Sequence, residues 1–301
     1  MKIPQFLTTG DKVAIVCPAS YIKGNIDNAI SILTDWGLKV EVGETVTSQY
    51  HQFAGTDELR TQDLQKALDN PEIKAVFAAR GGYGTVRIID QLDFNNFTQN
   101  PKWLVGFSDI TVLHSHIHFT LGIPTLHGQM PKSFDDSTKD ALISLKKALF
   151  GESMDYSYSQ QEYPNRPGEG TGTLIGGNLA LLHSLISSES DGSYDNKILF
   201  IEDVGEQHYN IDRMLWTLKR AGKLAKLQAL IVGGFTELKD SNPPFGQRFE
   251  DIIFDKVKEY DYPVAFHYPA GHIENNHTLV LGKKVNLLVE GEQVTLTYKT
   301  P

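Results

Sequence analysis

The sequence of 301 residues contains one cysteine, Cys17, and this scarcity excludes an intrachain disulfide. A chain without disulfides is compatible with a reducing compartment. Cys17 ends the apolar run of residues 13–17, so we interpret it as a small buried residue rather than a reactive thiol.

Long apolar segments and basic charge are also lacking. No stretch approaches the roughly 18 apolar residues that a membrane-spanning helix needs, and the first residues lack the pattern of a signal peptide. We therefore expect a cytoplasmic protein without membrane contact. With 37 acidic against 28 basic residues, the formal net charge is −9, which argues against a nucleic-acid partner.

No complete cofactor or metal motif is present either. Residues 80–84 (RGGYG) depart from the dinucleotide-binding pattern because Arg87 stands where its last glycine belongs, and they are not a P-loop. We interpret them as a tight turn whose N–H groups can hold an anion or oxyanion. His114, His116 and His118 lack the accompanying Glu or Cys ligands of a zinc site, so we expect a polar helix surface or interface there. No metal and no cofactor are expected.

What the sequence does contain is a regular alternation of strand and helix patterns in its first half. Strands are predicted at residues 12–17, 38–42, 73–78 and 103–107, with helices at 25–36, 56–68, 85–92 and 137–150. This order predicts a doubly wound α/β domain whose parallel sheet has helices on both faces. Ligands bind beyond the carboxyl ends of such strands.

Ser108 lies at one of these strand ends, directly before a helix pattern. The geometry is typical of a nucleophile elbow, although Gly-x-Ser-x-Gly is incomplete because Ile110 replaces the second glycine. The alternative is that Ser108 or Asp109 only caps the helix.

The second half begins after a segment rich in Gly and Pro, residues 151–172, which we interpret as a linker between domains 1–150 and 173–301. Strand patterns follow at 197–204, 229–234, 263–266, 277–281, 284–288 and 293–297, and the last three resemble closing strands. Helices are predicted at 178–186, 211–218 and 249–257.

A serine nucleophile needs a base and a carboxylate that orients the base. Glu202 and Asp203 end a buried strand, and since neighbouring strand residues point to opposite faces, only one of them is expected to reach the site. Spacing does not distinguish among the candidate bases, which are His51, His127, His208, His267 and His272.

The chain resembles the LD-carboxypeptidase (muramoyl-tetrapeptide carboxypeptidase) family, which includes the microcin C immunity peptidases. The resemblance covers nearly the whole chain. It rests on motifs in one order: residues 53–60 (FAGTDELR), 80–84 (RGGYG), 106–111 (GFSDIT), 174–179 (LIGGNL), 198–204 (ILFIEDV), 211–215 (IDRML) and Gly271-His272.

The resemblance implies a serine carboxypeptidase with Ser108 as nucleophile, His272 as base and Glu202 as the orienting carboxylate. The backbone N–H groups of Gly82 and Asp109 would form the oxyanion hole. It also implies a C-terminal α/β domain with a barrel-like sheet, a site between the domains, and a homodimer. The implied substrate is a small peptide, the murein tetrapeptide, cut before its terminal D-alanine during cell-wall recycling.

Two other functions remain open at this point. A microcin-immunity enzyme cleaves peptidyl-aminoacyl nucleotides, and the resemblance implies that tryptophans before the catalytic Glu stack on the nucleobase. Residues 187–196 contain no Trp, although Tyr194 could stack. A noncatalytic ligand-binding module is the second alternative.

Overall fold

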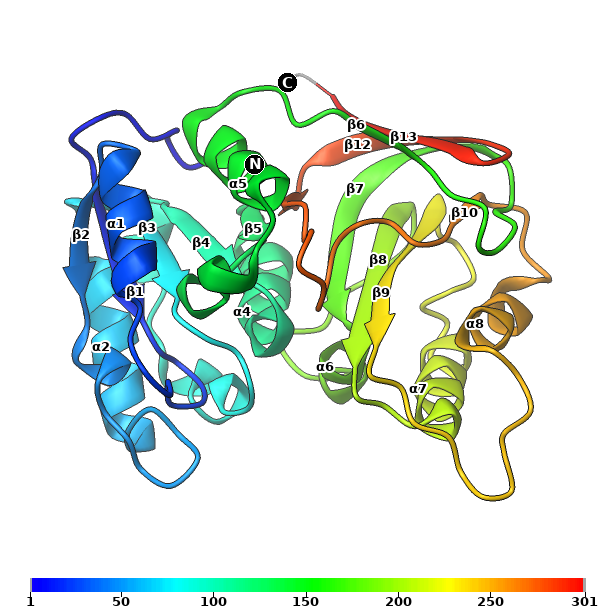
Figure 1. Cartoon of the computed structure of the whole chain (residues 1–301), viewed down its shortest axis with the longest axis horizontal. Coiled ribbons are helices and arrows are strands. Elements are labelled where there is room, and N and C mark those ends of the chain that lie inside the picture. The colour runs from blue at the N-terminus through cyan, green and yellow to red at the C-terminus, as the bar shows by residue number, and fades with distance from the viewer. Residues whose placement is uncertain (1, 300–301) are drawn as a thin grey trace. The chain divides into compact units, whose positions relative to one another are not determined.

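The apolar runs of the sequence form two sheets, each in its own unit of a computed structural model that describes residues 2–299 (Figure 1). The first unit comprises residues 2–152 and 274–280, and the second comprises residues 153–273 and 281–299. No helix in this described part of the chain is both long and apolar enough to cross a membrane. The structure thus confirms a two-unit α/β protein.

The sheet of the first unit has six strands in the order β11-β5-β4-β3-β1-β2. Their bounds are Lys12–Val16 (β1), Lys39–Val42 (β2), Ile73–Ala78 (β3), Trp103–Gly106 (β4), Thr125–His127 (β5) and Leu279–Leu281 (β11). β1 to β5 pair in parallel, and the strand order reverses direction between β1 and β3. The loops after β1 and β3 therefore meet at the switch point where such folds bind ligands.

The described residues of the first unit contain five α-helices: Asp27–Asp35 (α1), Asp57–Asp69 (α2), Asn95–Gln99 (α3), Thr111–His116 (α4) and Lys139–Phe150 (α5). α2 begins where the Thr56 side chain accepts the Leu59 N–H, and α5 begins where Thr138 accepts the Ala141 N–H. The helix expected over residues 85–92 is instead two short 3₁₀ helices, Thr85–Arg87 and Ile89–Gln91.

The sheet of the second unit has seven strands in the order β10-β9-β8-β7-β12-β13-β6. Their bounds are Tyr156–Ser159 (β6), Gly168–Asn178 (β7), Lys197–Val204 (β8), Ala229–Thr236 (β9), Val264–Ala265 (β10), Lys284–Glu290 (β12) and Gln293–Tyr298 (β13). β7 to β10 pair in parallel, whereas β12, β13 and β6 are antiparallel to their neighbours. Its helices are Leu179–Ser184 (α6), His208–Arg220 (α7) and Phe249–Val257 (α8), and α7 packs against α8 (Figure 1).

Three expectations for the second half are corrected. The sheet is mixed and open, with β10 and β6 as its edges, and no closed barrel is present among the described strands. The strand expected at 277–281 begins at Leu279 and belongs to the first sheet, as β11. The expected linker of residues 151–172 contains β6 and the first part of β7, which pair with β13 and β12.

Candidate active site

Ser108 follows β4 in a backbone conformation that L-residues rarely adopt. Its φ is +64°, between the extended Phe107 and the 3₁₀ turn that leads into α4. A non-glycine residue in this region costs about 1–3 kcal/mol and persists where the surroundings hold it. A helix cap needs no such strain, so the geometry favours the nucleophile elbow over the capping interpretation.

The Gly-rich loop lies directly against this serine. A Cβ atom at Gly81 would lie 3.0 Å from Ser108 Oγ and 3.4 Å from the Asp109 backbone nitrogen, so only a glycine lets the two backbones approach this closely. Ser20, after β1, holds the loop: its N–H donates to Gly81 O and its Oγ accepts the Tyr83 N–H. The Gly-rich loop and the turn at Ser108 thus lie in close contact.

We call Ser108, Asp109 and residues 81–84 the serine turn. The serine turn thus offers the Ser108 hydroxyl and the backbone N–H groups of two segments.

His272 and Glu202 form a close pair in the second unit. His272 Nδ1 lies 2.6 Å from Glu202 Oε2, and the carboxylate is completely buried whereas the imidazole is about one-fifth exposed. When Nδ1–H donates to the carboxylate, Nε2 carries the lone pair of the neutral ring. We call these two residues the His272–Glu202 pair.

Glu202, which contacts this histidine, lies at an irregularity in β8. The register of β8 with β9 shifts between Ile201 and Asp203, as in a β-bulge, at the residue that carries the carboxylate. Gly271 has φ +117°, and a Cβ there would lie 2.8 Å from Glu202 Cβ. The glycine before the histidine is therefore required by both its conformation and its contact.

The surroundings of His272 favour its charged form. Burial lowers the pKa of His272, but the charge and hydrogen bond of Glu202 outweigh burial, with added contributions from Asp203 and Glu237. The net result is a pKa above the usual value of 6.5. An imidazole with this environment is a stronger base once it is neutral.

Asp203 points to a different partner, as the strand pattern predicts. Its Oδ1 accepts from Asn178 Nδ2 at 2.9 Å, and its Oδ2 accepts the Ala180 N–H at 3.0 Å. Burial, followed by the charge of Glu202, raises the pKa of Asp203 to about 7. Asp203 thus stabilises the turn into α6, while Glu202 contacts His272.

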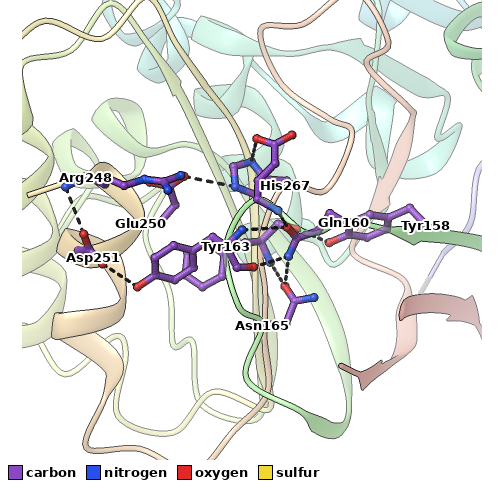
Figure 2. A network of polar contacts seen from close by, with 10 residues as sticks. Tyr158, Gln160, Tyr163, Asn165, Arg248, Glu250, Asp251 and His267 are labelled. Atoms are coloured by element: carbon purple, nitrogen blue, oxygen red, sulfur yellow. Dashed lines mark hydrogen bonds and ion pairs between the residues drawn. The ribbon is translucent and has the colours of Figure 1, made fainter. Parts of the chain in front are cut away.

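Residues from the expected linker hold the segment that precedes His272, and Figure 2 labels three of them, Tyr158, Gln160 and Asn165. Tyr158 Oη donates to Phe266 O at 2.6 Å, and Asn165 Oδ1 accepts the Phe266 N–H at 2.9 Å. Gln160 Nε2 donates to the same Asn165 oxygen. β6 and the residues after it therefore fix the start of the loop of residues 266–272, which ends at His272.

His267 extends this network on the other side of the loop (Figure 2). It has φ +55°, and its Nε2 lies 3.3 Å from Glu250 Oε1. Glu250 is also paired with Arg248. His267 therefore belongs to the support of the loop and is not paired with Glu202.

The other candidate bases have different environments. His51 lies in an exposed turn, His127 is buried at the end of β5, and His208 begins α7 near Asp240. Sequence spacing gave no means of separating them from His272, because the distinguishing feature is a carboxylate 70 residues away.

The expected polar surface around His114 is wrong. His114 is buried in the core and hydrogen-bonds to Thr125 Oγ1 at 2.8 Å and Gly106 O at 2.9 Å, and burial lowers its pKa to about 4. Among residues 2–299 no group of three or more His, Cys, Asp or Glu side chains is arranged to hold a metal ion. Cys17 is buried, as expected, and burial raises the pKa of its thiol to about 12.

Comparison with protein families gives two matches that follow the two halves of the chain. Residues 13–128 match the LD-carboxypeptidase N-terminal domain, and residues 171–287 match the LD-carboxypeptidase C-terminal domain.

Individual proteins agree with these matches. A probable murein peptide carboxypeptidase of Bacillus subtilis is 34% identical over 93% of this chain and 90% of its own. The crystal structure of muramoyltetrapeptide carboxypeptidase from Oxalobacter formigenes is 29% identical, with a TM-score of 0.86 over 96% of this chain and 99% of its own. The microcin C7 self immunity protein MccF, in complex with aspartyl sulfamoyl adenosine, has a TM-score of 0.89 over 99% of both chains. Its 21% identity shows a shared fold alone.

Proposed function

The chain belongs to the LD-carboxypeptidase family, a family of serine-type hydrolases, and from this premise we propose that it removes the terminal D-alanine from murein tetrapeptides. The bond cut is the L,D-peptide bond before that residue. Ser108 acts as nucleophile, His272 as general base and Glu202 as the carboxylate that orients the base. The observation that carries this proposal is the 2.6 Å His272–Glu202 contact in a chain that also presents a strained serine against a Gly-rich loop.

The two groups of residues are chemically complementary. The serine turn offers a hydroxyl and N–H donors, whereas the His272–Glu202 pair offers a base and its orienting carboxylate. In the chain, His272 stands two residues before residues 274–280, which belong to the first unit. The proposed triad takes its nucleophile from the first group and its base and carboxylate from the second.

The proposed reaction has two stages. His272 Nε2 takes the Ser108 proton while Oγ attacks the carbonyl carbon, and the N–H groups of Gly82 and Asp109 stabilise the oxyanion. The imidazolium then donates its proton to the leaving amine, D-alanine departs, and an acyl ester remains on Ser108. His272 next activates water, which hydrolyses the ester and releases the tripeptide.

The nucleotide-cleaving alternative needs an accessible aromatic ring that can stack on the nucleobase, and the candidate for this role, Tyr194, is buried. Tyr194, the only large aromatic residue between 187 and 196, is 2% exposed, and Lys223 Nζ lies 4.9 Å from its ring centroid. A ring enclosed in this way has no free face for a nucleobase. The murein peptide therefore remains the proposed substrate.

The family resemblance also leads us to propose a homodimer that works in the cytoplasm. Sedimentation at several protein concentrations tests the dimer, and fractionation of cells tests the compartment.

Released D-alanine is the decisive measurement for the substrate. We expect the purified protein to release D-alanine from tetrapeptides carrying either diaminopimelate or lysine before it, and the ratio of the two rates will define the preference. A tetrapeptide ending in L-alanine and an aminoacyl-nucleotide conjugate serve as controls. Faster turnover of the conjugate than of both tetrapeptides would overturn the assignment.

A further inference from the structure

The carboxylate of Asp109 links the two segments of the serine turn, Ser108-Asp109 and the Gly-rich loop of residues 81–84. Its Oδ2 accepts the Thr85 backbone N–H at 2.8 Å, and the residue is completely buried. Oδ1 is also buried and has no hydrogen-bond partner among the described residues. Asp109 directly follows the nucleophile, whereas Thr85 directly follows the loop, so this one contact joins two segments 24 residues apart in sequence.

The peptide unit between Gly84 and Thr85 is also held at its oxygen, by the buried side chain of Arg60. Arg60 is completely buried, and its Nη1 donates to Gly84 O at 2.9 Å and to Pro18 O at 2.5 Å. Gly84 O and the Thr85 N–H belong to one peptide unit. Arg60 therefore fixes the oxygen of this peptide while Asp109 fixes its N–H.

This peptide lies two residues after Gly82, whose N–H is one of the two proposed oxyanion donors. The other donor is the N–H of Asp109 itself. We propose that the Asp109 side chain is a positioning residue, which sets the separation of the two donors by holding the loop to the turn. This inference rests on the proposed function and assigns to the side chain a role separate from that of the backbone N–H.

The charge of the carboxyl fits such a role. Burial raises the pKa of Asp109, against the opposing hydrogen bonds from Thr85 and Gly84, so the buried position disfavours the charge of the carboxylate. A neutral group that still accepts the Thr85 N–H should therefore serve as well as the carboxylate. Asparagine is such a group, since its amide oxygen accepts a hydrogen bond at nearly the same position.

The test compares Asp109→Ala and Asp109→Asn on a tetrapeptide substrate. Removing one oxyanion donor typically lowers kcat by about 10²–10³-fold, so for Asp109→Ala we expect a loss of about 10²-fold with KM changed less than about threefold. Asp109→Asn should recover kcat to within about tenfold of wild type. A tripeptide aldehyde, whose aldehyde carbon takes the place of the carbonyl carbon before D-alanine, adds to Ser108 and forms an oxyanion, and it should lose affinity for Asp109→Ala in proportion to kcat.

Asp63→Ala is a matched control, because Asp63 also accepts a backbone N–H in the first unit, that of Thr45 at 2.9 Å. This variant should lose stability but keep kcat. An unchanged kcat in folded Asp109→Ala, or an Asp109→Asn variant as slow as Asp109→Ala, would overturn the positioning role. If Asp109→Ala does not fold, Asp109→Glu takes its place, with the same expected loss because the longer side chain displaces the loop.

Failure of the proposed function has a different signature. If Ser108→Ala retains activity, or if no tetrapeptide is cleaved by the wild type, the triad or the substrate is wrong irrespective of Asp109. If Ser108→Ala is inactive and Asp109→Ala is fully active, the triad stands and only the positioning role is lost.

Discussion

The serine turn and the His272–Glu202 pair differ in whether backbone or side-chain atoms form them. The serine turn is made mainly by the backbone: a left-handed residue at φ +64°, a glycine that permits close approach, and peptide N–H groups held by neighbouring loops. The pair is made by side chains, with a buried carboxylate 2.6 Å from an imidazole. Side chains can be exchanged one at a time without moving the main chain, whereas a backbone arrangement responds to every residue that holds it.

This difference implies that substitutions at the two places fail in different ways. Changes in the pair should alter protonation and pH dependence, and changes around the serine turn should alter oxyanion stabilisation with little effect on pH dependence. The following measurements test this contrast, beginning with the largest effect.

Ser108→Ala should lower kcat by about a million-fold, the usual cost of losing a triad nucleophile, while the protein remains folded. Ser108→Gly should be equally inactive but more stable than Ser108→Ala, because glycine adopts φ +64° without strain. Steady-state kinetics and thermal unfolding report both quantities. A folded Ser108→Ala variant with a tenth of wild-type activity would contradict the nucleophile assignment.

His272→Ala should abolish activity, whereas Glu202→Gln should lower kcat by about 10⁴-fold because the histidine remains but is poorly oriented. His277→Ala is the matched control, since this histidine is five residues away and belongs to the first unit. We expect its kcat to stay close to wild type. If instead His277→Ala is inactive and His272→Ala is active, the wrong base has been chosen.

The pH dependence of kcat/KM should show an acidic limb with its midpoint above 6.5. The neutral imidazole is the active form, and Glu202, outweighing burial, raises the pKa of His272. Activity therefore falls as pH decreases through that raised pKa. In Glu202→Gln the limb should move to lower pH, while in Asp109→Asn it should stay in place; movement in both variants would remove the contrast between the two regions.

Asp203→Asn should have the smallest effect on kcat and a measurable one on stability. Burial raises the pKa of Asp203 to about 7, so between pH 4 and 7 the folded protein binds more protons here than the unfolded chain, and stability falls as pH rises. The asparagine variant should lack this contribution, on the order of a few kcal/mol at most. Thermal unfolding at pH 4.5 and 8 measures it, and equal pH slopes for the two proteins would contradict the assigned direction.

Local sequence patterns predict the serine turn well because its parts are local. A strand, a serine and a helix follow one another within residues 103–116, and the residues 80–84 turn is visible from its glycines. The positive φ of Ser108 is not predictable in this way, but the strand-to-helix turn that requires it is.

The pair is harder to predict because its residues come from distant strands and loops. Five histidines had equal standing by spacing, and the resemblance alone selected His272. In the structure His272 lies 2.6 Å from Glu202, which stands at the bulge in β8, and this contact joins residues 70 apart in sequence. The strands within residues 151–172 are hard to predict for a related reason. Their Gly, Pro and polar composition is typical of a loop, and β12 and β13, the strands with which they pair, are more than 100 residues away in sequence.

The return of residues 274–280 to the first unit has a consequence for synthesis on the ribosome. These residues provide β11, and Thr278 accepts a hydrogen bond from Ser144 in α5, so the first sheet lacks its edge strand until nearly the whole chain has been translated. Domains usually fold as units, with the N-terminal one first. Here the first sheet gains its edge strand from a segment that emerges after His272, so the first unit completes its fold only after that histidine has been made.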